Sequence, residues 1–162
     1  MRRSILISFL LVGCTGLSSQ LFAQRKAVSG AEVTGTFRSY FKGKAKGSYN
    51  EILIQALGRN QLKVEMGLTY PYQINNGEWS ANIGEASGVA VIEGDTAIFV
   101  PDHVDNPTEE DKKCKITLKF TKPATLLVTS ENNINCGFGH NVSADGTYQK
   151  VSSARPKFHA NQ

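Results

Sequence analysis

The sequence predicts an all-β protein, folded as a small antiparallel up-and-down barrel of about eight strands. Hydrophobic residues alternate with polar ones over most of the chain after residue 23, and the clearest run lies between Leu62 and Tyr70. Side chains of a β-strand point alternately to its two faces, so this period of two indicates strands with one face in a core. Helix-like spacing over ten or more residues is absent from the same part of the chain.

Eight segments carry the alternating pattern. In chain order they are residues 32–41, 48–57, 60–70, 79–92, 95–100, 114–121, 125–130 and 141–150. The connections between most of them are short, so neighbours in sequence are expected to be neighbours in space. A closed barrel leaves no strand edge unpaired, which favours it for eight antiparallel strands in one small domain. A two-sheet β-sandwich is the alternative.

Turn-forming residues separate the predicted strands. Gly58-Arg59-Asn60 follows the second segment, and Glu93-Gly94-Asp95 is typical of a tight hairpin between the fourth and fifth. Lys122-Pro123-Ala124 is expected to reverse the chain after the sixth, because proline fixes φ and donates no hydrogen bond to a central strand. After Pro156 the chain is polar and is expected to fray.

The first residues resemble an export signal. Arg2 and Arg3 precede an apolar stretch at residues 5–12, and a small residue, Ala23, stands at the expected cleavage point. We therefore predict a signal peptide at residues 1–23 and one barrel domain at residues 24–162, in a periplasmic or secreted protein. The formal net charge of +4 would fall to +2 once the two arginines are removed, which gives no reason to expect a nucleic-acid partner.

A second processing route competes with the first. Leu11-Val12-Gly13-Cys14 resembles a bacterial lipobox, in which Cys14 would become a lipidated first residue. The protein would then be a lipoprotein anchored through Cys14. On either route no apolar stretch reaches the ~20 residues that a membrane-spanning helix requires.

The two other cysteines are Cys114 and Cys136. One cysteine pair in an oxidising compartment most simply forms one disulfide, worth about 3 kcal/mol in the chain-entropy model. Two cysteines alone do not complete the four-ligand shell of structural zinc, so we predict no metal site. Cys114 shares the inward phase of Ile116 and Leu118, which places the disulfide at the end of a buried face.

Two longer connections are candidate binding regions, because loops carry function more often than strands do. They are residues 71–85 and 101–113. The candidate binding residues in them are Tyr72, Trp79, Asp102, His103 and Asp105. With Tyr49 and Tyr70, the aromatic side chains either form an exposed recognition surface, line the mouth of the barrel or build a small satellite core. The carboxylates of 101–113 are calcium-type ligands, but their spacing differs from the EF-hand pattern, which favours a solvated charge run.

A catalytic constellation is not apparent in the sequence. The three histidines, His103, His140 and His159, are far apart in the chain, and no nucleophile elbow, zinc-protease, P-loop or dinucleotide motif accompanies them. We therefore expect a non-enzymatic protein without a cofactor. Lys42, Lys44 and Lys46, on a predicted hairpin turn, either contact anionic cell-wall polymer or lipid headgroups or simply oppose aggregation.

The segment from Cys136-Gly137-Phe138-Gly139 to Gly146-Thr147-Tyr148 resembles the ending of small exported bacterial β-barrel proteins. The resemblance extends loosely over residues 35–150. In export, size and calycin-like barrel plan, the chain is also distantly similar to the periplasmic and lipoprotein inhibitors of c-type lysozyme. We transfer no inhibitory residue of that family to this chain.

These observations favour a non-enzymatic binding protein of the bacterial envelope. The resemblance implies a protein partner, with a lysozyme as the most specific expectation, bound by the two long connections. The alternative is a lipocalin-like carrier with a small apolar ligand inside the barrel, since eight strands leave room for packed side chains or for one such ligand.

Overall fold

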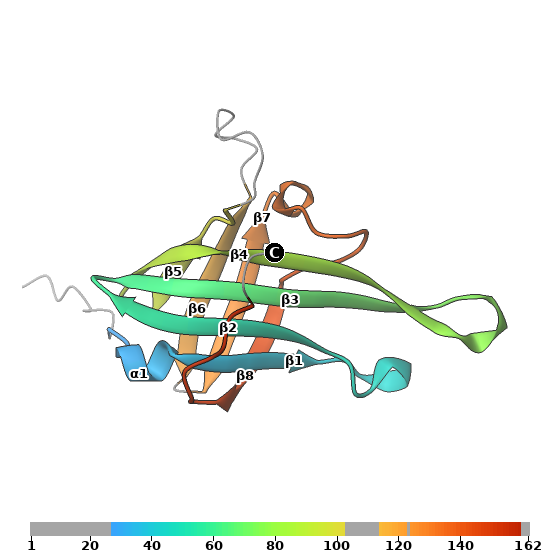
Figure 1. The fold of residues 1–162 in the computed structure, drawn as a ribbon, viewed down its shortest axis with the longest axis horizontal. Helices are drawn as coiled ribbons and strands as arrows, with labels where there is room; N and C mark the ends of the chain where they lie inside the picture. The colour runs from blue at the N-terminus through green and yellow to red at the C-terminus, as the bar shows by residue number, and fades with distance from the viewer. Residues whose placement is uncertain (1–26, 103–113, 123, 160–162) are drawn as a thin grey trace, which may run out of the picture.

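A computed structural model describes residues 27–102, 114–122 and 124–159. It is a closed barrel of eight antiparallel strands in sequence order, each paired with the next and β8 paired with β1 (Figure 1). The strands are β1 (Gly35–Tyr40), β2 (Tyr49–Gly58), β3 (Gln61–Gln73), β4 (Trp79–Glu93), β5 (Thr96–Phe99), β6 (Lys115–Lys122), β7 (Thr125–Glu131) and β8 (Gly146–Ser152). The predicted up-and-down barrel is confirmed.

Three strand boundaries differ from the prediction by three or more residues. The first predicted strand begins with a short helix, α1 (Gly30–Val33), because Ser29 and Glu32 form a reciprocal capping box that starts a helical turn. The predicted connection 71–85 is mostly strand, since β3 pairs with β4 as far as Gln73 and Trp79. The last strand begins at Gly146, after a short 3-10 helix, η4 (Asn133–Cys136).

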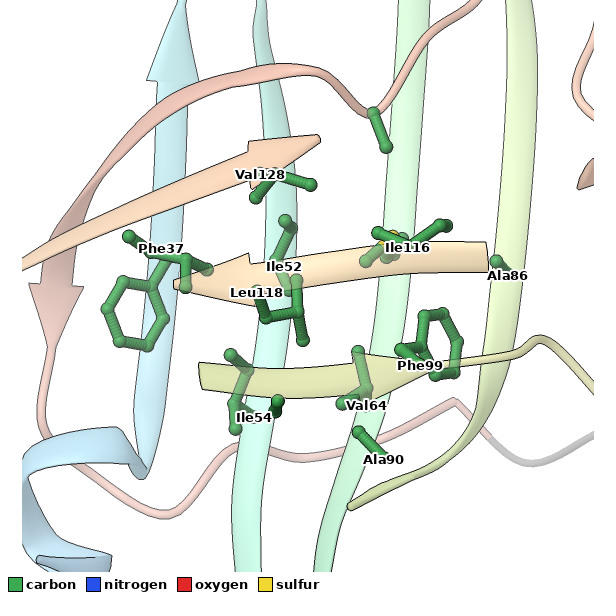
Figure 2. Packing of buried hydrophobic residues seen from close by; sticks show 14 of the residues in the cluster. Phe37, Ile52, Ile54, Val64, Ala86, Ala90, Phe99, Ile116, Leu118 and Val128 are labelled. Atoms are coloured by element: carbon green, nitrogen blue, oxygen red, sulfur yellow. The ribbon is translucent and has the colours of Figure 1, made fainter. Parts of the chain in front are cut away.

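The inward side chains of the eight strands form one hydrophobic cluster. Figure 2 shows Phe37, Ile52, Phe99 and Leu118 converging from four strands, and each is fully buried. The inward face of β4 carries only small residues between positions 84 and 90, namely Gly84, Ala86, Gly88 and Ala90. Those small residues leave room for larger rings from neighbouring segments. The Phe99 ring lies 3.2 Å from where a Cβ on Gly88 would be.

One end of the barrel, the tight-turn end, has two-residue turns. Arg59 and Asn60 both have positive φ between β2 and β3, as a type I′ turn requires. Gly94 has a positive φ between β4 and β5. Helix α1 lies at this end, and the Lys150 ammonium donates to the Ala31 and Glu32 carbonyls at its C-terminal side. Partial burial lowers the pKa of Lys150.

The other end, the loop end, has the longer connections. An up-and-down barrel places alternate connections at the same end, so the β1–β2, β3–β4, β5–β6 and β7–β8 connections lie here. The predicted Cys114–Cys136 disulfide is present and joins the start of β6 to η4. Residues after η4 then contact β4, where the Gly139 amide donates to the Ile83 carbonyl and the Asn82 side chain donates to the His140 carbonyl.

The β3–β4 hairpin extends beyond the rest of the barrel (Figure 1). Its strands pair through thirteen rows, from Gln61 opposite Val91 to Gln73 opposite Trp79, whereas β1 pairs with β2 through six. Pro71 is accommodated because β2 begins at Tyr49, which leaves this part of β3 with β4 as its neighbour in the sheet.

Candidate binding surface

A groove of about 910 Å³ lies on the barrel wall formed by β2, β3 and β4. Glu51, Gly67 and Glu85 are directly opposite one another in adjacent strands and form one row of it. Gly67 supplies the floor, because a Cβ built there would meet no atom within 4 Å. The missing side chain leaves a hollow between two carboxylates. We call this hollow and its lining the outer groove.

The outer groove is acidic, and its carboxylates differ in their partners. The Arg38 Nε donates to Glu51 across 2.6 Å, and this bond to Glu51 is the main cause that raises the pKa of Arg38. Glu65, in the next row, pairs with the imidazole of His159. Glu85 makes no ion pair with any residue that the structure describes. The groove therefore retains negative charge facing solvent.

The C-terminal segment, residues 153–159, crosses the outside of β2 and β3 (Figure 1). His159, at the end of this segment, lines the outer groove. The Arg155 Nε donates to Gln55 across 3.0 Å, and the Lys63 ammonium lies 4.5 Å from the centre of the Phe158 ring. Leu53 lies on the outer face in a neighbouring row, opposite Glu65, and is only 7% exposed. The expectation that the tail frays after Pro156 is therefore wrong as far as His159, because Phe158 contacts Lys63 and His159 contacts Glu65, both on β3.

His159 places an imidazole ring, which can carry a positive charge, at the groove. Its amide donates to the Glu65 carboxylate across 3.1 Å, and its ring nitrogen contacts the same carboxylate. The pKa of His159 is raised above its usual value by the hydrogen bond to Glu65, with smaller contributions from Glu85 and Glu51. The groove thus stabilises positive charge on a side chain that enters it.

An apolar face continues from the outer groove along the hairpin. Ile83, two residues before Glu85, lines the groove and is 65% exposed, and Trp79, on the same face of β4, is 48% exposed. On the outer face of β1 and β2, the Tyr40 and Tyr49 rings pack edge to face, with Arg38 stacked on Tyr49. Exposed aromatic and aliphatic side chains beside charged ones are typical of protein-binding surfaces.

The structure separates the predicted binding residues that it describes. Tyr72 and Trp79 lie in adjacent rows of the hairpin and therefore point to opposite faces. Asp102 borders the outer groove beside β4, where its amide donates to the Ser87 carbonyl. His103 and Asp105 lie outside the described residues, as do Cys14, the predicted signal peptide and most of the acidic connection 101–113.

Gly67, Ile83 and Glu85 were not among the predicted site residues. Ile83 and Glu85 could have been identified from the sequence if residues 79–85 had been assigned to a strand. Alternation then places Trp79, Ala81, Ile83 and Glu85 on one face. The place of Gly67 in the groove can be recognised only from the strand register, which sets it between Glu51 and Glu85.

Two of the three histidines, His140 and His159, lie in the described part of the chain. The described ranges contain no group of three His, Cys, Asp or Glu side chains arranged to hold a metal ion. His140 contributes its backbone carbonyl to Asn82, and His159 lies on the barrel wall at Glu65. Among the described residues, no helix is long and apolar enough to cross a membrane.

A scan of the chain against protein-family models finds no match, and no curated protein or solved structure matches it either.

Proposed function

We propose that this chain is an exported, non-enzymatic binding protein of the bacterial envelope that binds a protein partner through the outer face of β4. The main support for the proposal is the exposed Ile83 beside the outer groove, where an aliphatic side chain adjoins the unpaired carboxylate of Glu85. A partner that presents a lysine or arginine next to an apolar patch matches this surface, since the groove already stabilises the charge of His159.

A basic lysozyme is the first partner to test. The distant similarity to lysozyme inhibitors supports this choice, and so does the acidic character of the groove. The lipocalin-like alternative requires space inside the barrel, whereas the inward side chains from Phe37 to Tyr148 pack into one buried cluster. That packing favours a ligand on the outside of the barrel.

The test measures lysis of cell-wall suspensions by c-, g- and i-type lysozymes at increasing concentrations of the processed protein. We expect dose-dependent protection against one type. The variant Ile83→Ala/Glu85→Gln should lose at least tenfold in inhibitory potency, because it removes both the apolar contact and the unpaired charge.

A matched control lies on the same strand. Val91→Ala/Glu93→Gln makes the same kind of change at exposed outward positions eight residues further along β4, toward the tight-turn end. Its potency should equal that of the unaltered protein. No protection at tens of micromolar against any type would exclude lysozymes as the partner, and equal losses in both variants would contradict the assignment to the outer groove.

A further inference from the structure

The turn between β1 and β2 carries three exposed lysines, Lys42, Lys44 and Lys46. The turn is ordered by backbone hydrogen bonds, from Lys46 to the Gly43 carbonyl and from Ser48 to the Ala45 carbonyl. None of the three ammonium groups pairs with a carboxylate within the described part of the chain. We call residues 42–48 the lysine turn. It is a compact site of uncompensated positive charge.

The end of the β3–β4 hairpin, residues 70–79, is rich in exposed apolar surface. Tyr70, Tyr72, Ile74 and Trp79 are between 37% and 48% exposed, and they project from both faces of the hairpin. These residues include one acid, Glu78. We call this segment the hairpin tip. Tryptophan and tyrosine combine a large apolar ring with a polar group, which suits the boundary between lipid headgroups and acyl chains.

The topology brings the lysine turn and the hairpin tip to the same end of the barrel (Figure 1). Glu51 pairs with Gly67, so Tyr49, where β2 begins, lies level with Thr69. From there β3 runs four more residues to Gln73, which is about 13 Å at the rise of an extended strand. The apolar hairpin tip therefore starts from the same level as the lysines and reaches in the same direction.

We propose that the lysine turn and the hairpin tip together dock the protein on an anionic phospholipid bilayer. The lysines contact lipid phosphates, and Ile74 and Trp79 enter the boundary between headgroups and acyl chains. Positive charge beside exposed aromatic and aliphatic side chains is the combination that binds a protein to an anionic bilayer surface without spanning it. This site is distinct from the outer groove, whose carboxylates it does not use.

The protein carries its own probe for the test, because Trp79 is its one tryptophan. Processed protein, expressed from the full chain and with its N-terminus established by mass spectrometry, is titrated with vesicles of phosphatidylglycerol or of phosphatidylcholine. We expect a blue shift of Trp79 emission and saturable binding with phosphatidylglycerol, both reduced by salt. Equal binding to the two lipids, or binding without an emission shift, would overturn the proposal.

Two variants separate the contributions of charge and insertion. Each lysine near an anionic surface contributes about a fivefold change in affinity, so Lys42→Gln/Lys44→Gln/Lys46→Gln should bind about a hundredfold more weakly. Ile74→Ser should bind several-fold more weakly with a smaller emission shift. Circular dichroism and thermal unfolding of each variant confirm that the barrel is intact, since these side chains are exposed or at a turn.

The matched control changes three exposed lysines away from the loop end, Lys63→Gln/Lys119→Gln/Lys157→Gln, which alters the net charge by the same amount. It should bind phosphatidylglycerol vesicles within about threefold of the unaltered protein, and an equal loss would show that only net charge matters. Soluble polyphosphate that binds as tightly as the vesicles would also contradict a bilayer site. The Ile83→Ala/Glu85→Gln variant should keep its lipid binding, so this result is independent of the lysozyme test.

Discussion

The two ends of the barrel differ in the length of their connections and in the side chains that they expose. At the tight-turn end, two-residue turns and the contact of Lys150 with α1 close the barrel with short connections. At the loop end, a disulfide and the segment after η4 hold the backbone, while the lysine turn and the hairpin tip expose charge and aromatic surface. The difference shows that the loop end exposes charge and aromatic surface in addition to the contacts that hold its backbone.

The largest effect on stability is expected at Phe37, on the inward face of β1. Phe37 is fully buried and packs edge to face on Phe120 at 6.1 Å. Phe37→Ala should lower the free energy of unfolding by about 3–5 kcal/mol, because it leaves a cavity where packing is dense. Urea unfolding measures this. A loss below about 1 kcal/mol would contradict a packed interior.

The disulfide is expected to have the next largest effect. Replacing both Cys114 and Cys136 by alanine should cost about 3 kcal/mol of stability, since the cross-link restricts the unfolded chain. Hydrogen exchange should increase mainly at the loop end, around η4 and the Gly139–Ile83 contact. Uniform acceleration over all eight strands would argue that the bond does not act locally.

A much smaller effect on stability is expected at Ile83, which is exposed, whereas Phe37 is buried. Ile83→Ala should change the free energy of unfolding by less than about 0.5 kcal/mol, because the side chain is 65% exposed. The same urea experiment measures it. A loss comparable to that of Phe37→Ala would mean that Ile83 stabilises the barrel and is not reserved for a partner.

The smallest effect concerns the docking of the C-terminal segment at Glu65. The pKa of His159 is raised in the docked state above its usual 6.5. Docking is therefore favoured fully below pH 6.5, where the free imidazole is already charged, and is lost as pH rises through the raised pKa. NMR titration of the His159 ring should give a midpoint above 6.5 that returns toward 6.5 in Glu65→Gln. An unchanged midpoint in that variant would exclude the pairing.

The strand pattern could be predicted because it depends on local chemistry. Alternation at Ile116 and Leu118 places Cys114 on the buried face, and Gly94-Asp95 forms the expected turn. The hairpin could not be predicted to its full length, because Pro71 and the polar residues near it resemble a loop. Their pairing becomes favourable only when β4 lies alongside.

Alternation and turn chemistry act over a few residues, so local patterns are enough to predict an all-β chain with a cysteine pair placed to join two of its segments. Contacts between distant residues are set by the tertiary structure. Gly67 lies between Glu51 and Glu85 because of strand register, and His159 reaches Glu65 because the chain doubles back after β8. Contacts between residues so far apart depend on how the barrel closes, and a local sequence pattern does not specify that closure.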